Sequence, residues 1–294
     1  MKQAPVRHAL EHALFLPFAG LCRALPHIAS RRLGRGLGAL AYALDRSHRR
    51  IAAENLAAAI PEIAPAERSR IVAACFRHFG GAFADALSSA RFDRVALCRR
   101  LELVGLDRLL EAEARGQGVV LVTAHYGAWE IAPQAIAQAA GPVVSVGRPI
   151  DNPHVDRTVR ALRERFGNRV VDKRGAVREM FRVLAHGGRL GLLIDQRVRA
   201  EEAIDVPFFG RPALTSPIVA RLALRTGAPV VPLFADPTAG GGYRVEFLEP
   251  LQVEATGDGE AVTFALTRRV VEICERVIRA APERWLWMHR RWKH

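Results

Sequence analysis

A histidine and a glutamate five residues apart, His125 and Glu130, are the side chains whose types and spacing are suited to chemistry. The apolar, β-branched run 118–123 in front of them is typical of a buried parallel strand. Five helical steps rotate a side chain by about 140°, so the two residues would not share one face of a straight helix. We therefore expect His125 in the turn after the strand, Gly127 at the bend and Glu130 in the first helical turn. From there Glu130 can reach back to orient the imidazole.

A histidine–carboxylate pair of this kind suits acyl transfer to an alcohol. Histidine titrates near neutral pH, and a carboxylate partner fixes its tautomer and stabilises the imidazolium. The imidazole can take the proton of an acceptor hydroxyl that itself attacks a thioester. An enzyme nucleophile is not needed, and the sequence has no Gly-x-Ser-x-Gly motif and no cysteine directly after a predicted strand. The spacing alone also fits a structural histidine.

Strand-like and helix-like segments alternate along the second half of the chain, which predicts an α/β fold with a central, mostly parallel sheet flanked by helices. The expected strands are 118–123, 142–147, 169–171, 190–194, 229–234 and 243–248, and the expected helices are 129–139, 153–166, 177–185, 216–225 and 262–280. Ligands of such sheets bind beyond the carboxyl ends of the strands. Four residues follow strands and should share that rim: His125, Arg148, Lys173 and Asp195.

The N-terminal region, residues 1–60, is rich in Ala and Leu and is expected to be helical and membrane-associating, ahead of an α/β domain over 61–294. The apolar stretch 13–22 is interrupted by Pro17 and is shorter than the ~18 residues of a spanning helix. We expect this segment to lie in the bilayer interface, although an ordinary packed helix is the alternative. The arginines expected at headgroup level are Arg23, Arg31 and Arg32.

The chain is strongly basic, with 43 Lys+Arg against 30 Asp+Glu and a formal net charge of +13. Nearly all of these cations are arginines, which bind phosphate through two parallel hydrogen bonds, although a GC-rich genome also favours arginine codons. Such a surface suits anionic lipid, an acidic carrier protein or nucleic acid. Recognition motifs for nucleic acid are absent from the sequence, so a non-catalytic binding protein is only the alternative. The four cysteines are widely spaced, which predicts buried free thiols and neither a metal site nor a cofactor.

Six blocks of the sequence occur in a specific order: His-Tyr-Gly-Ala-Trp-Glu (125–130), Gly-Arg-Pro-Ile-Asp-Asn-Pro (147–153), Asp-Lys-Arg-Gly-Ala (172–176), Leu-Leu-Ile-Asp-Gln (192–196), Val-Pro-Phe-Phe-Gly-Arg-Pro-Ala-Leu-Thr (206–215) and Trp-Leu-Trp-Met-His-Arg-Arg-Trp-Lys (285–293). Together they resemble the late acyltransferases of lipid A biosynthesis, the lauroyl and myristoyl transferases within the glycerolipid acyltransferase superfamily. The resemblance extends over nearly the whole chain. Tyr126 stands where that family often has Phe, and Ala128 stands where it often has Asn.

The resemblance implies an α/β acyltransferase with His125 and Glu130 as catalytic residues. It implies transfer of a fatty acyl chain from acyl carrier protein, or less often coenzyme A, to a hydroxyl of a lipid A precursor or related glycolipid. The expected place is the cytoplasmic face of a bacterial inner membrane, with the protein peripheral or anchored by its N-terminus. Related enzymes acylate phosphatidylinositol mannosides, so the acceptor stays open; an ornithine lipid or an aryl-polyene glycolipid are further candidates.

Five further residues are expected to bind substrate. Arg148 and Arg174 would bind phosphate of the acceptor or of the carrier's phosphopantetheine. Asp195 would hold Arg148 or position a sugar hydroxyl, with Gln196 and Thr215 beside it. Each has a structural alternative: a surface arginine, a turn cap at Asp195, and the N-cap of the following helix at Thr215.

Two aromatic segments complete the expected site. Phe208-Phe209-Gly210, together with Thr215, is expected to form a loop over it. Three of the four tryptophans lie within 285–292, interleaved with basic residues. This mixture suits a membrane interface, a lipid-headgroup pocket or a nucleic-acid surface, whereas a packed C-terminal tail is the plain alternative. We expect packing combined with headgroup contact.

Overall fold

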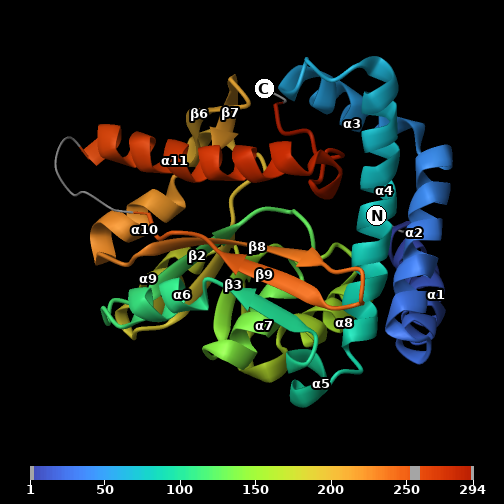
Figure 1. Cartoon of the computed structure of the whole chain (residues 1–294), viewed down its shortest axis with the longest axis horizontal. Coiled ribbons are helices and arrows are strands. Elements are labelled where there is room, and N and C mark those ends of the chain that lie inside the picture. Colours follow the sequence, from blue (N-terminus) through green and yellow to red (C-terminus); the bar gives the residue numbers. More distant parts are fainter. Residues whose placement is uncertain (1–2, 252–258, 293–294) are drawn as a thin grey trace.

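A seven-stranded sheet forms the centre of the computed structural model, which describes residues 3–251 and 259–292, with side chains from residue 7 (Figure 1). The strand order is β1-β9-β8-β2-β5-β3-β4, and only the β8–β9 pair is antiparallel. The mostly parallel sheet predicted from the sequence is therefore confirmed. Its strands are β1 (Leu101–Val104), β2 (Val119–Thr123), β3 (Val143–Gly147), β4 (Arg169–Asp172), β5 (Arg189–Leu193), β8 (Val230–Pro237) and β9 (Tyr243–Phe247).

Helices cover both faces of the sheet, and strand β2 shows why. Val120 and Val122 pack into one apolar cluster, with residues of α9, α10 and α11, whereas Val119 and Leu121 pack into a second cluster, with residues of α6 and α7. Because side chains alternate across a strand, burial on both faces requires an unbroken apolar run. The helices of this part are α5 (Arg94–Cys98), α6 (Leu106–Glu113), α7 (Ala132–Ala139), α8 (Pro153–Arg163), α9 (Ala176–Ala185), α10 (Ile218–Thr226) and α11 (Gly259–Ala280).

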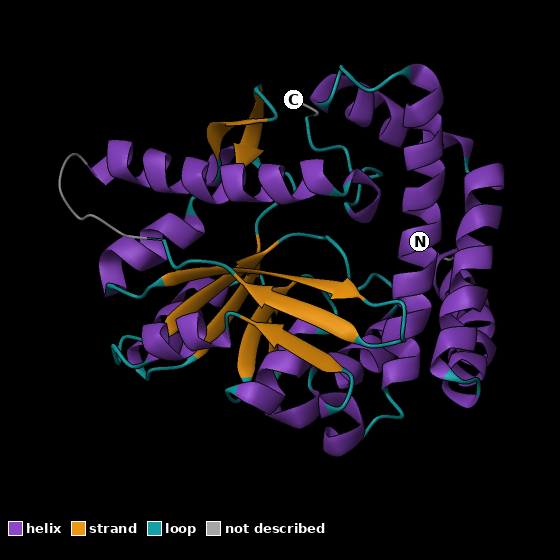
Figure 2. Ribbon diagram, viewed as in Figure 1, coloured by secondary structure: helices purple, strands orange, loops and turns teal. Residues whose placement is uncertain are grey.

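Four N-terminal helices stack beside the sheet, on the right of Figure 2: α1 (Gln3–Ala24), α2 (His27–Leu44), α3 (Arg46–Ala59) and α4 (Pro65–Ser89). Helices α2 and α4 touch through their backbones, since a Cβ on Gly34 would lie 2.2 Å from the Gly80 carbonyl oxygen. Ala52 and Leu56 of α3 belong to the same apolar cluster as Val120 of the sheet. The helices of residues 1–60 thus pack against the α/β part. Among the described residues, no helix is long and apolar enough to cross a membrane.

The predicted strands agree with the structure to within a few residues. The elements that the sequence did not predict are strand β1, helices α5 and α6, and an antiparallel hairpin of β6 (Ile204–Phe208) and β7 (Arg211–Thr215). The loop expected over the site at 208–210 is therefore wrong, because these residues form the turn of that hairpin. Three 3-10 turns complete the described elements: η1 (Arg165–Gly167), η2 (Ala200–Glu202) and η3 (Pro282–Arg284).

The cysteines follow the prediction with one exception. Cys22, Cys75 and Cys274 are free and buried, whereas Cys98 is free and exposed. Cys98 is the last residue of the five-residue helix α5, whose buried residue is Leu97. The expectation of a buried thiol is therefore wrong for Cys98.

Candidate active site

His125 and Asp195 face each other at the carboxyl ends of two neighbouring strands. Strands β2 and β5 pair in parallel, with Thr123 opposite Leu193, so the residues two positions beyond each strand meet. The Nδ1–H of His125 donates to Asp195 Oδ1 at 2.9 Å, and the backbone N–H of His125 donates to Oδ2 at 2.9 Å. Oδ2 also accepts the indole N–H of Trp285 at 2.8 Å. Three donors therefore hold this carboxylate against the imidazole.

The electrostatics of the pair favour the ionised forms of both groups. Burial opposes charge on His125 and lowers its pKa, but the charge and hydrogen bond of Asp195 outweigh it and raise the pKa above its usual value. Burial likewise raises the pKa of Asp195, but His125 and Trp285 outweigh it and hold the pKa below its usual value. Asp195 is thus a carboxylate at neutral pH, ready to stabilise an imidazolium.

The second nitrogen of the imidazole remains available for chemistry. Because Nδ1 donates to a carboxylate, which only accepts, Nε2 of neutral His125 carries the lone pair. The amide nitrogen of Gln196 lies 3.4 Å from Nε2, a long contact in which the amide can donate to that lone pair. The His125 side chain keeps 22% of its surface exposed, whereas Asp195 keeps 1%. A substrate can therefore reach the imidazole but not the carboxylate behind it.

Glu130 has a different partner from the one expected. Its two carboxylate oxygens accept from Arg163 Nε at 2.9 Å and Arg163 Nη2 at 2.5 Å, which joins the turn after β2 to helix α8. The expectation that Glu130 orients the imidazole is wrong, because Asp195 makes that hydrogen bond. Glu130 still acts on His125 through space, since its negative charge raises the pKa of the imidazole. A catalytic contribution from Glu130 stays a prediction.

Gly127 makes the bend that the sequence predicted. Its φ is +59°, and a Cβ at this position would lie 2.0 Å from the Ala235 carbonyl oxygen. Three hydrogen bonds fix the bend: Gly127 N–H to the Arg284 carbonyl, Ala128 N–H to the Ala235 carbonyl, and His78 Nε2–H to the Gly127 carbonyl at 3.1 Å. Burial lowers the pKa of His78 to about 4, so this imidazole is neutral at pH 7.

An apolar pocket opens beside this bend. It has a volume of about 50 Å³ and lies between helix α4, the segment 128–131 and helix α8. Trp129 lines it, and the Trp129 ring also lies 5.7 Å from the His125 ring, centroid to centroid. Trp129 therefore belongs both to the pocket lining and to the surroundings of the imidazole. Its largest apolar lining side chains are Phe83, Leu87, Trp129, Ile131 and Leu162.

The two arginines expected to bind phosphate lie farther along the rim. The sheet order is β2-β5-β3-β4, so Arg148 follows a strand two places from β2 and Arg174 follows one three places away. At about 4.8 Å per strand, these separations are about 10 and 14 Å. Arg148 is 80% exposed and pairs with Asp151 at 3.0 Å. The idea that Asp195 holds Arg148 is wrong, whereas phosphate binding by either arginine stays a prediction.

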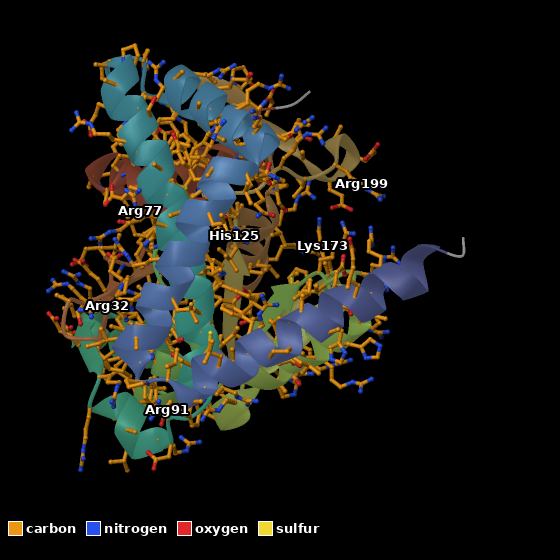
Figure 3. All side chains as sticks on the ribbon, turned by 90° about the vertical axis from the view of Figure 1, so that its right-hand side faces the viewer. Arg32, Arg77, Arg91, His125, Lys173 and Arg199 are labelled. Atoms are coloured by element: carbon orange, nitrogen blue, oxygen red, sulfur yellow. The ribbon has the colours of Figure 1, made fainter. Side chains whose placement is uncertain are left out.

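Lys173 and Arg174 are exposed residues that follow strand β4. Lys173 pairs with Glu202 at 2.9 Å and lies to one side of His125 in Figure 3. Arg174 is exposed, and its backbone N–H donates to Asp172. Both side chains are solvent-accessible cations near the same edge of the sheet. The prediction that these residues share one edge of the sheet is correct. That edge is too wide for all of them to line one site.

Thr215 lies beneath the site and not on its surface. Its side chain is fully buried, its hydroxyl donates to the Ala213 carbonyl, and Arg291 Nη2 donates to it at 2.5 Å. The expected N-cap role is also wrong, since α10 begins at Ile218 after Pro217. This geometry does not support direct substrate contact by Thr215, because its side chain has no exposed surface and its hydroxyl is already hydrogen-bonded.

The C-terminal segment packs under His125. Trp285, Trp287 and Arg291 are at most 1% exposed, and Trp292 is 9% exposed. Asn55 of α3 holds the segment through the carbonyls of Trp287 and His289. The expected packing is confirmed, but these buried tryptophan rings cannot also contact lipid headgroups. The sequence did not reveal that Trp285 holds the Asp195 carboxylate through a hydrogen bond.

The chain is similar to known acyltransferases over most of its length. The chain matches the family model described as bacterial lipid A biosynthesis acyltransferase over residues 2–294. It is 28% identical over 271 residues to the lipid A biosynthesis lauroyltransferase of Escherichia coli (strain K12), covering 92% of this chain and 87% of that protein. The lipid A biosynthesis palmitoleoyltransferase of the same organism is 24% identical, with 92% and 86% covered. A phosphatidylinositol mannoside acyltransferase of Mycobacterium tuberculosis (strain ATCC 25618 / H37Rv) is 30% identical, with 67% and 62% covered.

Proposed function

Because the chain belongs to the bacterial lipid A biosynthesis acyltransferase family, we propose that it moves a fatty acyl chain from a carrier thioester to a hydroxyl of a lipid A precursor or related glycolipid. The observation that carries this proposal is the His125 imidazole, held through Nδ1 by buried Asp195 and open at Nε2. That arrangement is a general base for an alcohol. The donor we propose is acyl carrier protein, whose acidic surface would suit a chain of net charge +13.

The reaction needs one proton to move twice. Nε2 of His125 takes the hydroxyl proton as the acceptor oxygen bonds to the thioester carbonyl carbon. The tetrahedral intermediate then breaks its carbon–sulfur bond, and the imidazolium returns the proton to the departing thiolate. The products are an ester and a free thiol. Asp195 stabilises the imidazolium between the two steps without itself accepting the proton. Gln196 must release Nε2 before the acceptor hydroxyl can occupy that position.

The first carbons of the donor acyl chain would lie against the apolar pocket beside Trp129, which at about 50 Å³ is too small for a whole fatty acyl chain. Its lining side chains come from α4, the 128–131 segment and α8, and they are almost all hydrocarbon. Glu130 and Arg163 close the polar side of this pocket as an ion pair. Burying a hydrocarbon chain there removes apolar surface from water at about 25 cal/mol per Å². The thioester carbonyl would then rest next to the His125 ring, since Trp129 contacts both.

The acceptor is a membrane lipid, and helices α1 and α2 supply the surface that would meet it. Eight of the large apolar side chains that are most exposed in the described part of the chain lie on these two helices: Leu10, Leu14, Leu16, Leu21, Ile28, Leu37, Leu40 and Leu44. Arg23, Arg32 and Arg35 of the same two helices are exposed as well, and Arg32 is labelled in Figure 3. An apolar face rimmed by arginine favours a peripheral position on an anionic bilayer. We therefore place the enzyme on the cytoplasmic face of the inner membrane.

Two acceptor classes remain to be separated by experiment. The relatives named above act on lipid A or on phosphatidylinositol mannoside by their descriptions. Mass spectrometry of membrane lipids, with and without the gene, identifies the acceptor as the lipid that loses one acyl chain. Loss of one chain from lipid A is the expected result. An unchanged lipid A together with a deacylated phosphatidylinositol mannoside, ornithine lipid or aryl-polyene glycolipid would refute the lipid A assignment.

Purified protein tests the donor. With acyl carrier protein and coenzyme A thioesters of the same acyl chain, we expect the carrier-protein thioester to give the higher kcat/KM. The surface cations predicted to meet phosphopantetheine, Arg148 and Arg174, can be replaced by Gln in the same assay. A rise in KM for the carrier thioester with little change in kcat is expected. Equal use of both donors by all variants would argue against the carrier-protein proposal.

A further inference from the structure

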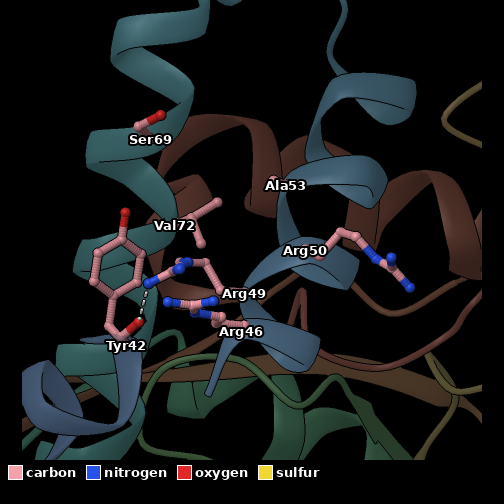
Figure 4. Close-up of a pocket in the computed structure, with 7 residues that line it drawn as sticks. All are labelled: Tyr42, Arg46, Arg49, Arg50, Ala53, Ser69 and Val72. Carbon is pink, nitrogen blue, oxygen red and sulfur yellow. Dashed lines mark hydrogen bonds between the residues drawn. The ribbon is translucent and has the colours of Figure 1, made fainter. Parts of the chain in front are cut away.

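A second pocket lies at the corner where helices α2, α3 and α4 meet (Figure 4). Its volume is about 320 Å³, and its lining comes from three helices: Tyr42 of α2, Arg46, Arg49, Arg50 and Ala53 of α3, and Ser69 and Val72 of α4. Ser69 stands ten residues before Phe79, whose ring contacts Trp129 at the active site. Along one helix this corresponds to about 15 Å. The pocket is therefore separate from the site of acyl transfer.

Two positive charges meet in this pocket without an acidic partner. Figure 4 shows the guanidinium groups of Arg46 and Arg49 side by side next to the Tyr42 ring, whereas Arg50 points away. Arg49 donates to the Tyr42 carbonyl at 2.7 Å and lies 5.2 Å from the centre of that ring. In the part of the chain that the structure describes, neither Arg46 nor Arg49 forms an ion pair. Adjacent like charges repel, so an anion between them would stabilise the arrangement.

The chemistry of the lining selects phosphate. Guanidinium groups match the oxygens of a phosphate through paired hydrogen bonds. Nearby acids already have partners: Asp45 caps α3 and pairs with His48, Glu54 pairs with Arg50, and Glu67 pairs with Arg70. The pocket therefore presents the two cations of Arg46 and Arg49 to one anion.

A lipid is the source of phosphate that the surroundings favour. Leu44, at the α2–α3 junction between Tyr42 and Arg46, is 72% exposed, which is the highest exposure among the large apolar side chains described. Leu40, one turn earlier on the same helix, is 53% exposed. An apolar side chain that stands next to a phosphate-binding cation is the arrangement that a bilayer surface satisfies, with the leucine in the acyl region and the arginine at the headgroup.

We propose that the Arg46–Arg49 pocket binds the phosphate of an anionic phospholipid headgroup and thereby fixes the height and orientation of the enzyme on the membrane. The proposal rests on the membrane association proposed above. An anchor about 15 Å along α4 from the active site would hold His125 at a constant distance from the lipid headgroups. The acceptor hydroxyl would then be presented at a fixed depth.

The test compares two double variants that lose the same charge. Arg46→Gln/Arg49→Gln removes the pocket cations, whereas Arg99→Gln/Arg115→Gln removes two exposed arginines outside the pocket. Sedimentation with phosphatidylcholine vesicles, with and without phosphatidylglycerol, measures membrane affinity. We expect the pocket variant to lose about 30-fold in affinity for phosphatidylglycerol vesicles, the loss expected for two headgroup-bound cations. The control should lose less than about threefold. Equal losses in both variants would overturn the proposal, because the attraction would then be a general effect of net charge.

Soluble ligands separate the pocket from the membrane itself. Calorimetry with dihexanoyl phosphatidylglycerol monomers should give binding that disappears in Arg46→Gln/Arg49→Gln and persists in the control. This result supports the pocket even if the protein does not bind vesicles of long-chain lipids. Failure to bind those vesicles would refute only the membrane association. If inorganic phosphate binds the pocket but the short lipid does not, the site takes free phosphate and the lipid proposal is wrong. Arg46→Gln alone, which breaks no hydrogen bond or ion pair of the described residues, checks that a loss is not caused by unfolding.

Discussion

Replacing Asp195 by Asn tests how the site controls the proton of His125. The carboxylate accepts three hydrogen bonds, two at Oδ2 from the His125 backbone and Trp285, and one at Oδ1 from the imidazole. An asparagine keeps one oxygen and gains an NH₂ group. If the NH₂ replaced Oδ2, it would face the backbone N–H of His125 and the indole N–H of Trp285, and neither of these donors can become an acceptor. If it replaced Oδ1, it would face only the imidazole, which can move its proton. We expect the second arrangement, with the imidazole proton on Nε2.

The expected cost follows from that tautomer. Nε2 then carries a proton and cannot accept one from the acceptor hydroxyl, so general-base catalysis is lost. The same replacement in the Ser-His-Asp triad of proteases lowers kcat by about 10⁴, and we expect a loss of about 10³ to 10⁴ here. This corresponds to about 4 to 5.5 kcal/mol of transition-state stabilisation. Because the fold of the strand ends is kept, KM should change little.

Steady-state acyl transfer by Asp195→Asn gives the rate, and ¹⁵N NMR of the histidine rings gives the tautomer. Asp151→Asn is the matched control, since Asp151 is an exposed carboxylate at the same edge of the sheet whose ion pair among the described residues is with Arg148. We expect wild-type kcat in the control. A kcat of Asp195→Asn within tenfold of the wild type, with Nδ1 still protonated, would refute the reasoning.

Three further predictions concern titrating groups around His125. The kcat/KM of the wild type should rise with pH through an apparent pKa above 6.5, because Asp195 holds the pKa of His125 up; a limb at or below 6.5 would contradict this. Glu130→Gln should move that limb to lower pH, since one negative charge near His125 is removed and Arg163 loses its partner; an unchanged pH profile would show that Glu130 does not act on the imidazole. The pKa of His78 is about 4 in the fold against 6.5 for an exposed histidine, so its stabilising effect is complete above pH 6.5 and is lost as the pH falls toward 4. Denaturant titrations should show about 3 kcal/mol of this loss in the wild type and not in His78→Gln, which keeps a donor for the Gly127 carbonyl; parallel curves for the two proteins would contradict the assignment.

The strands that carry the site could be predicted because their residues are buried on both faces. The run Val119–Thr123 is apolar without alternation, as a central parallel strand requires. The hairpin was missed because Pro207 and Pro212 lie inside its strands, and proline argues against a strand. In the structure the two prolines face each other in a two-stranded ribbon outside the main sheet, where a missing N–H is tolerated. Strand β1 was missed because its four residues are only partly buried.

His125 was predicted correctly as the residue in the turn, but its partner was not. Glu130 is close in sequence, whereas Asp195 is 70 residues away and becomes a neighbour only because β5 pairs with β2. Strand order is set by packing over the whole sheet and is not visible in local periodicity. The position of Asp195 directly after a buried strand was the available signal. Trp285 gave no such signal, since nothing in its spacing shows which acid its N–H reaches.

The most direct test of the account measures acyl transfer by His125→Ala. With a carrier-protein thioester and a lipid A precursor, we predict that kcat falls by at least 100-fold, toward the rate without enzyme, since a positioned base contributes about 10² to 10⁴. Circular dichroism should show that the fold is kept, because the His125 side chain is partly exposed and its backbone bond to Asp195 remains. Turnover within tenfold of the wild type in a folded His125→Ala protein would contradict the central claim that this imidazole takes the proton of the acceptor.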